Sequence, residues 1–181
     1  MISESARASS AGEARFRISD PNSARRRVKV VALDGPSAAL IKGLAQHQWD
    51  GASFFIATTP DMTTTPDPLA HPRANSATEN WATESWLIDI TGQRKDLANE
   101  IGSADLVVMI AMAGESAANA SDIGAACRRS GVTLSGLVLA NASTPDAVLS
   151  ETSAHLRAWT QMLVVASAAD YVADMLTALR A

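Results

Sequence analysis

The chain has 181 residues, of which 47% are hydrophobic and 19% charged, and its formal net charge is −4 at pH 7. This length and composition are ordinary for a single globular domain with a sizeable core. The acidic balance argues against a nucleic-acid-binding protein, because such proteins carry clustered positive charge. Cys127 is the only cysteine, which excludes an internal disulfide framework and a cysteine-based metal site. We expect this thiol to be buried and structural.

Neither a membrane span nor a secretory signal is predicted. The longest apolar run, residues 106–113, has the length of a buried strand. The N-terminus is rich in Ser, Ala and Arg and lacks the apolar segment of a signal peptide. We therefore expect a cytoplasmic protein that does not associate with membranes.

Residues 1–26 predict a flexible N-terminal arm, because small and polar residues dominate them without any periodicity. A β-α-β unit follows. Residues 28–33 are apolar and β-branched, which is typical of a buried strand, and residues 34–37 have the composition of a turn. Apolar residues then recur at helical spacing up to Gln48, and residues 53–57 predict a second strand, parallel to the first.

Residues 58–82 predict an irregular loop, because prolines and a run of threonines interrupt every regular pattern. A loop this long in a compact domain is usually functional or disordered. Trp81 and Trp86 bracket its end, and two roles stay open for them: packing the loop onto the body, or binding a partner. We expect any homo-oligomer or protein partner to be bound through the N-terminal arm and this Trp81/Trp86 loop.

The rest of the chain alternates between strands and helices. The patterns predict strands at residues 86–90, 106–113, 133–140 and 162–166, and helices at residues 96–101, 116–130, 146–159 and 171–179, with Gly131 as a helix C-cap. Such alternation is typical of layered α/β domains. We therefore predict a single three-layer Rossmann-like α/β domain over residues 27–181, with a mostly parallel sheet of about six strands.

Polar residues follow the predicted strands and define the candidate site. The most informative turn is at residues 114–119, where a buried strand gives way to one glycine and a run of small polar residues. In open α/β sheets such turns gather along one edge and hold phosphates or nucleotides. The candidate ligand-binding residues are Asp34, Gly35, Ser37, Gly114, Glu115, Ser116, Asn119, Asn141, Ser143 and Asp170.

No catalytic residue, metal site or cofactor is predicted. The three histidines, His155 among them, have no metal-ligand spacing and are expected at the surface or in helix packing. Neither a nucleophile elbow nor a Walker-type phosphate loop occurs. Glu115 is the best candidate for acid/base or cation chemistry, although an acidic residue in a helix's first turn also stabilises the helix dipole. Ser37 and Ser116 have two open interpretations as well, as ligand contacts or as helix N-caps.

Several segments, taken in chain order, resemble the tubulin/FtsZ-type GTPase domain. The segment of residues 28–61 resembles its opening strand, turn, helix and strand, with Ala-Thr-Thr-Pro-Asp where the family has a motif like Ala-Val-Asn-Thr-Asp. Residues 104–114 resemble the strand that enters the family's phosphate-binding signature loop, and residues 123–138 resemble the helix and strand after that loop. The last strand and Asp170 also fall in order. The resemblance covers roughly half to two-thirds of the chain and implies a nucleotide-binding fold.

The loops depart from the family's pattern. Its signature loop is a glycine-rich run whose bare backbone amides wrap the phosphates, whereas this chain has Gly-Glu-Ser-Ala-Ala-Asn-Ala at residues 114–120. Side chains obstruct the approach of the backbone, and Glu115 places a negative charge where a phosphate would sit. Pro36 removes an amide from the first loop. The chain ends at Ala181, so we also expect the family's second domain, with its catalytic acidic loop, to be absent. The comparison implies that GTP hydrolysis is lost and that filament assembly of the family's usual kind is not expected.

Three functions stay open, of which the third is a partner-bound subunit of a larger complex with the N-terminal arm and the Trp81/Trp86 loop as its contacts. The first is a non-catalytic tubulin/FtsZ-like domain that acts as a binding or assembly protein. The second is a small enzyme or ligand-binding domain that resembles sugar isomerase (SIS) domains in pairing a strand with a Ser-bearing turn and a helix start. Such a domain recognises a phosphorylated metabolite at the carboxyl ends of the strands, with Ser37 and Ser116 as its contacts.

Overall fold

A computed structural model describes residues 26–58, 86–167, 170–179 and 181. The elements are β1 (Val28–Ala32), α2 (Gly35–Leu44), β2 (Ala52–Ala57), β3 (Trp86–Asp89), β4 (Arg94–Asp96), α3 (Leu97–Gly102), β5 (Leu106–Met112), α4 (Ala120–Ser130), β6 (Thr133–Leu139), α5 (Asp146–Arg157), β7 (Met162–Ala166) and α6 (Asp170–Ala178). The predicted N-terminal arm and irregular loop, with Trp81, lie outside the described residues except for Arg26 and Thr58. Trp86 begins β3 and is 39% exposed, and its role in binding a partner stays a prediction.

The seven strands of the described residues form one sheet in the order β4-β3-β2-β1-β5-β6-β7. β1 pairs in parallel with β2 and β5, and the parallel pairing continues through β6 to β7. β3 runs antiparallel to β2, and β4 antiparallel to β3. The Rossmann-like α/β fold with a mostly parallel sheet is therefore confirmed. The additional strand, β4, has the sequence Arg-Lys-Asp and so offers no apolar alternation to the sequence analysis.

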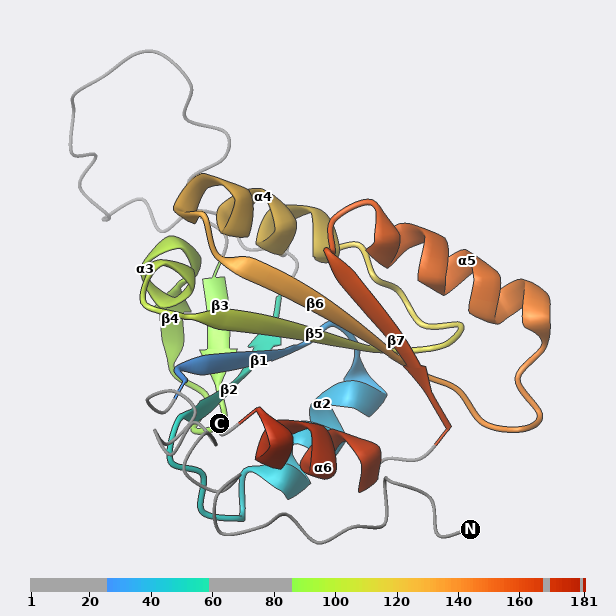
Figure 1. The fold of residues 1–181 in the computed structure, drawn as a ribbon, viewed down its shortest axis with the longest axis horizontal. Coiled ribbons are helices and arrows are strands. Elements are labelled where there is room, and N and C mark those ends of the chain that lie inside the picture. Colours follow the sequence, from blue (N-terminus) through green and yellow to red (C-terminus); the bar gives the residue numbers. More distant parts are fainter. Residues whose placement is uncertain (1–25, 59–85, 168–169, 180) are drawn as a thin grey trace, which may run out of the picture.

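Helices cover both faces of this sheet, which gives the predicted three layers (Figure 1). On one face, α2 and α6 contribute Ile41 and Leu176 to a buried apolar cluster. On the other face, α3, α4 and α5 contribute Ile101, Ile123 and Leu156 to a second cluster. The central strand β5 supplies alternate side chains to the two clusters, Val107, Met109 and Ala111 to one and Leu106, Val108 and Ile110 to the other, as the period of a strand requires.

Helix α2 begins earlier than the apolar spacing predicts. Asp34 is its N-cap, and Gly35 and Pro36 occupy its first turn. The helix ends at Leu44, so the predicted extension to Gln48 is wrong. The earlier start arises because capping by the Asp34 side chain, rather than apolar periodicity, determines where the helix begins.

Helix α4 begins at Ala120, so the predicted start at residue 116 is wrong. Residues 114–119 form turns instead, in which Gly114 has a φ of 90° and the Ala120 N–H donates to the Ala117 carbonyl at 3.0 Å. The predicted C-cap is confirmed, because Gly131 ends α4 in the left-handed region with a φ of 66°. The polar turn after β5 is therefore a loop of its own and not the first turn of a helix.

Trp159, just after α5, joins this helix to α4. A Cβ added to Gly124 of α4 would lie 2.6 Å from Trp159 Cε3, so only glycine leaves room for the ring. One turn further along α4, the Arg128 Cζ lies 4.6 Å from the centre of the same ring. The Arg128 guanidinium also donates to the Ala158 carbonyl at 2.7 Å. A close backbone contact and a cation–π contact thus hold the two helices together.

This packing predicts opposite effects for two glycine substitutions. Gly124→Ala is expected to lower the free energy of unfolding by about 1–3 kcal/mol, because overpacking against Trp159 outweighs the gain in helix propensity. Gly43→Ala in α2 is the matched control, since a Cβ there meets nothing within 4 Å. It is expected to raise the free energy of unfolding by about 0.5–1 kcal/mol. Urea unfolding measures both, and changes of the same sign would contradict the Trp159 contact.

Candidate functional site

The crevice between β1 and β5 is the topological switch point of the sheet, because the chain proceeds from these two strands in opposite directions. In open α/β sheets, ligands bind in this crevice at the carboxyl ends of the strands. Here the Asp34 carboxylate bridges it. Its Oδ1 accepts from the Ser37 N–H at 2.7 Å, and its Oδ2 accepts from the Met112 N–H of β5 at 2.8 Å. One carboxylate therefore caps α2 and binds the backbone of the neighbouring strand.

Ser37 completes this arrangement from the other side. The Asp34 N–H donates to Ser37 Oγ at 3.2 Å, and Ser37 Oγ donates to the Asp34 carbonyl at 3.1 Å. The two residues form a capping box with Ser37 at the third helical position, and the Ser37 side chain is buried. Ser37 is thus a member of the cap but not the N-cap residue itself.

The turn after β5 is closed by helix α5. The Gly114 N–H donates to Thr152 Oγ1 at 3.0 Å, and Thr152 Oγ1 donates to the Val148 carbonyl at 3.2 Å. A Cβ added to Gly114 would lie 3.1 Å from Val148 Cγ1, so the turn lies close against α5. The Glu115 N–H donates to the Met112 carbonyl at 3.1 Å. Two backbone amides of this turn are therefore satisfied within the protein.

A cavity of about 390 Å³ lies between this turn and α5, and we call it the loop–α5 cavity. It is lined by Gly114, Glu115, Ser116, Ala117, Ala118, Glu151, Thr152 and His155. The two carboxylates, the imidazole and the Ser116 side chain are exposed to solvent. Within the described residues, no group of three or more His, Cys, Asp or Glu side chains is arranged to hold a metal ion. The cavity therefore offers hydrogen-bonding groups and negative charge.

The structure distributes the candidate residues over several places. Gly114, Glu115 and Ser116 line the loop–α5 cavity, whereas Asp34, Gly35 and Ser37 form the start of α2. Asn119 is the N-cap residue of α4 but makes no capping hydrogen bond with its side chain, and Asp170 is the first residue of α6. Because α4 begins at Ala120, Glu115 is not in its first turn and Ser116 is not its N-cap.

Asn141 and Ser143 form a closed turn of their own after β6. Asn141 Oδ1 accepts from the Ser143 N–H at 2.9 Å and from Ser143 Oγ at 2.6 Å. The Thr144 hydroxyl donates to the same oxygen at 3.1 Å, and its Oγ1 accepts from the Asn141 N–H at 3.0 Å. This Asx turn uses the polar atoms locally and accounts for both residues structurally.

Three polar lining residues of the loop–α5 cavity, all on α5, were not among the candidates: Glu151, Thr152 and His155. The prediction that His155 lies on the surface of a helix is compatible with its place here. The signal that identifies this set is spacing, because residues three or four apart share one face of a helix. That face turns toward the loop after β5, which no local pattern indicates.

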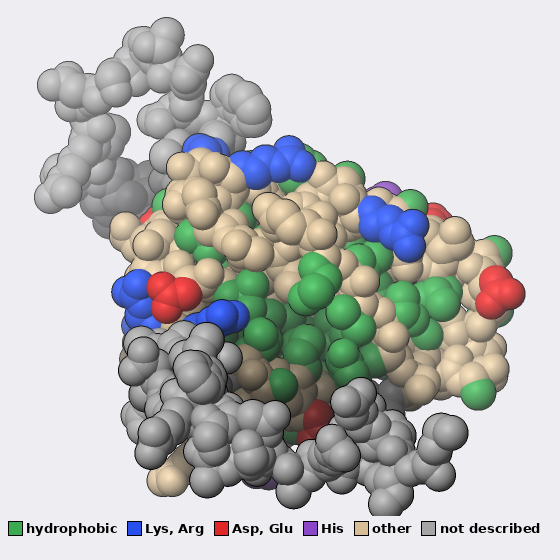
Figure 2. All heavy atoms as spheres, viewed as in Figure 1, with side chains coloured by type: hydrophobic (Ala, Val, Ile, Leu, Met, Phe, Trp, Pro, Cys, Tyr) green, Lys and Arg blue, Asp and Glu red, His purple; other side chains and the backbone are tan. Residues whose placement is uncertain are grey.

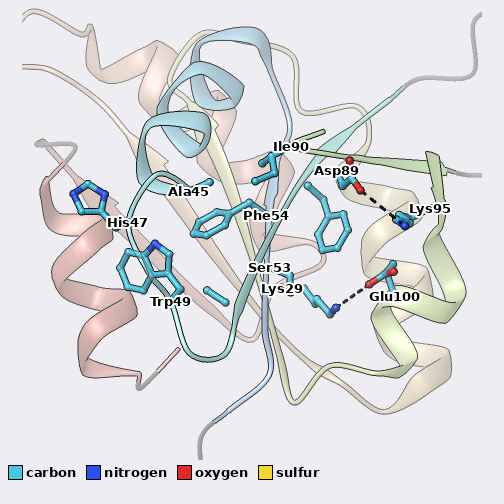
Figure 3. Close-up of a pocket in the computed structure, with 12 residues that line it drawn as sticks. Lys29, Ala45, His47, Trp49, Ser53, Phe54, Asp89, Ile90, Lys95 and Glu100 are labelled. Atoms are coloured by element: carbon cyan, nitrogen blue, oxygen red, sulfur yellow. Dashed lines mark hydrogen bonds and ion pairs between the residues drawn. The ribbon is translucent and has the colours of Figure 1, made fainter. Parts of the chain in front are cut away.

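A second cavity, of about 460 Å³, lies beside the first half of β2 (Figure 3). Figure 3 shows His47, Trp49 and Phe54 on one side and Lys95 and Glu100 on the other. It is positioned where β3 stops pairing with β2, because β3 pairs only with residues 55–57. We call it the sheet-edge cavity.

The charged groups of the sheet-edge cavity are paired with one another. Lys29 Nζ lies 2.8 Å from Glu100 Oε2 and 5.2 Å from the centre of the Phe55 ring. Lys95 Nζ lies 3.9 Å from Asp89 Oδ2. Each of these cations already has an anionic neighbour, and the cavity borders the amino-terminal half of β2 rather than the carboxyl ends of the strands. The loop–α5 cavity is therefore the better candidate site on the grounds of fold.

Cys127 is buried in α4, which confirms its predicted structural role. Burial raises the pKa of its thiol to about 12. Since the thiolate is the reactive form, alkylation of the folded protein at about pH 8 is expected to be much slower than alkylation of the urea-unfolded chain. The rate should rise with pH as the thiolate forms. Mass spectrometry after timed alkylation measures both rates, and equal rates would contradict the burial.

The two roles of Asp34 predict a larger loss of stability than a helix cap alone gives. Asp34→Ala removes the cap and leaves the Met112 amide without its acceptor, so we expect a loss of about 2–4 kcal/mol. Asp96→Ala is the control, because Asp96 caps α3 through a single hydrogen bond to the Asn99 N–H at 2.8 Å. It should cost about 1 kcal/mol. Equal losses in chemical unfolding would show that the bond to β5 contributes nothing.

The sheet, its layers and its crevice define the class of this chain as a Rossmann-like α/β domain. No protein-family model and no curated protein sequence matches it. In the part of the chain that the structure describes, no helix combines the length and apolar character needed to cross a membrane.

Proposed function

We propose that this chain is a non-catalytic tubulin/FtsZ-like domain that acts as a binding or assembly protein and has lost GTP hydrolysis. The supporting observation is that the protein's own side chains close both turns at the switch point. A phosphate-binding loop presents free backbone N–H groups to the anion. Here the amides of Ser37 and Met112 donate to Asp34, and the amide of Gly114 donates to Thr152.

The charges of the loop–α5 cavity also support this proposal, because they disfavour the phosphorylated ligand that the SIS-like alternative requires. Glu115 and Glu151 both line it, and their carboxylates repel an anion placed near them. Among the described residues, its lining includes neither Lys nor Arg, which are the residues that most often bind phosphate. The SIS-like alternative has the further difficulty that Ser37, one of its two contact residues, is 0% exposed.

Titration with nucleotide tests the proposal directly. Isothermal titration with GTP and with GDP, each with and without Mg²⁺, is expected to give no binding heat. A phosphate-release assay is expected to show no turnover, because the amides that would hold the phosphates are already bonded. GTP binding at micromolar concentration together with turnover would overturn the proposal.

A thermal-shift screen distinguishes the SIS-like alternative. Nucleotides, phosphosugars and acyl phosphates are expected to leave the unfolding temperature of the wild type unchanged. The double variant Glu115→Gln, Glu151→Gln removes the negative charge of the cavity and is the matched test of the electrostatic argument. A shift in the wild type that Ser116→Ala abolishes would favour a phosphorylated metabolite as the ligand.

A further inference from the structure

The two end strands of the sheet differ sharply in charge. β7, with the sequence Met-Leu-Val-Val-Ala, is one end, and within the described residues it pairs with β6 alone. Met162 is 53% exposed and Val165 is 48% exposed. In the view of Figure 1, β6 and β7 lie nearest the viewer. Figure 2, from the same side, shows hydrophobic side chains gathered in the middle of the visible surface and charged side chains toward its margins.

The opposite end strand, β4, has features that discourage pairing with another strand, and β7 lacks them. β4 has three residues, Arg-Lys-Asp, all of them charged. An end strand presents unpaired N–H and C=O groups to any other strand, and natural proteins discourage such pairing with short strands and charged side chains. β4 has both features, whereas β7 is longer and has no charged residue, no proline and no glycine. Of the two end strands in the described part of the chain, β7 is therefore the one without these protective features.

We infer that β7 is the assembly surface of this protein and that its partner is the β7 of a second copy. The two strands pair antiparallel about a two-fold axis, so that one sheet continues through both copies. This inference rests on the proposed assembly function and names the partner.

The sequence of β7 is complementary to itself in this arrangement. With Val164 at the axis, Val164 lies opposite its own counterpart, Leu163 opposite Val165, and Met162 opposite Ala166. Every cross-strand pair is then apolar, and no like charges meet. A two-fold axis perpendicular to the sheet also keeps the faces aligned, so that α6 of one copy continues the α6 layer of the other. The pairing is isologous, which is the usual form of a soluble dimer.

Pairing of β7 with β4 of another copy is the competing arrangement, and it would generate an open filament. It would place the apolar β7 against Arg94, Lys95 and Asp96, whose charges would lose water without gaining partners. Pairing of β7 with the β7 of a second copy avoids this cost. Since each copy has one β7, no β7 edge then remains for a third copy. Assembly therefore stops at the dimer.

The mass of the protein in solution tests the inference without any nucleotide. Light scattering coupled to size exclusion is expected to give twice the chain mass of 18.9 kDa for the wild type. Val165→Lys is expected to give the single-chain mass, because it places a positive charge on the pairing edge. Ile90→Lys is the matched control, since Ile90 is 46% exposed but lies just beyond β3, and it should remain a dimer. Circular dichroism and thermal unfolding establish that both variants fold.

A monomeric wild type at the highest soluble concentration, or a dimeric Val165→Lys protein that folds, would overturn the inference. A mass above the dimer would indicate pairing between different edges and would overturn it too. These masses are independent of the nucleotide titrations, so failure of the β7 pairing and failure of the proposed loss of GTPase activity are separate results.

An introduced cysteine tests the position of the axis. Residues directly opposite in an antiparallel pair have Cα atoms about 4.5–5.5 Å apart, which is within the range that a disulfide requires. Val164→Cys is therefore expected to form a disulfide with its own counterpart under mild oxidation, while the buried Cys127 stays unreactive. Ile90→Cys should give no cross-linked dimer. Failure of Val164→Cys to cross-link in a protein that is dimeric by mass would overturn the two-fold pairing at Val164.

Discussion

The Asp34 carboxylate is the interaction on which the arrangement of this domain depends. Its two oxygens bind two backbone amides, one at the start of α2 only three residues away and one at the end of β5, 78 residues further along the chain than Asp34. Helix capping requires an acceptor at this position, and a parallel β5 places a backbone N–H beside it. The same side chain thus fixes where α2 begins and joins the two central strands at their carboxyl ends. In the crevice that usually receives a ligand in this fold class, these backbone amides therefore donate to a side chain of the protein itself.

The fold follows from the sequence wherever burial determines the pattern. β5 could be predicted because its first six residues are buried, so an uninterrupted apolar run marks it. β4 could not be predicted, because an end strand of three charged residues shows no alternation of apolar and polar residues in the sequence. The start of α4 was misplaced for another reason. Residues 115–120 are alanines and polar residues, which occur both in turns and at helix starts, so local propensity does not decide between the two.

The candidate site is harder to predict because its decisive contacts are long-range. Gly114 and Thr152 are 38 residues apart, and only the packing of α5 against the loop reveals that their hydrogen bond exists. The expectation that polar turns gather at one edge of the sheet follows from the parallel direction of the strands. Each turn, however, has its own nearest partners. Asn141 bonds to Ser143 and Thr144, and Asp34 bonds to Ser37, so these polar atoms are already satisfied locally.

The crevice that Asp34 bridges and the uncharged end strand β7 have a common physical basis, since both concern backbone groups at the boundary of the sheet. At the carboxyl ends, side chains satisfy those groups internally. At β7, no strand of the described residues pairs with the outer backbone groups, while β6 pairs with the inner ones. A Cβ at Gly136 of β6 would lie 2.7 Å from Leu163 Cδ1, so Leu163 lies against the bare backbone of its neighbour. An edge that is already ordered loses little conformational entropy when a partner strand pairs with it. Tight packing on the inner side of β7 therefore favours pairing on its outer side.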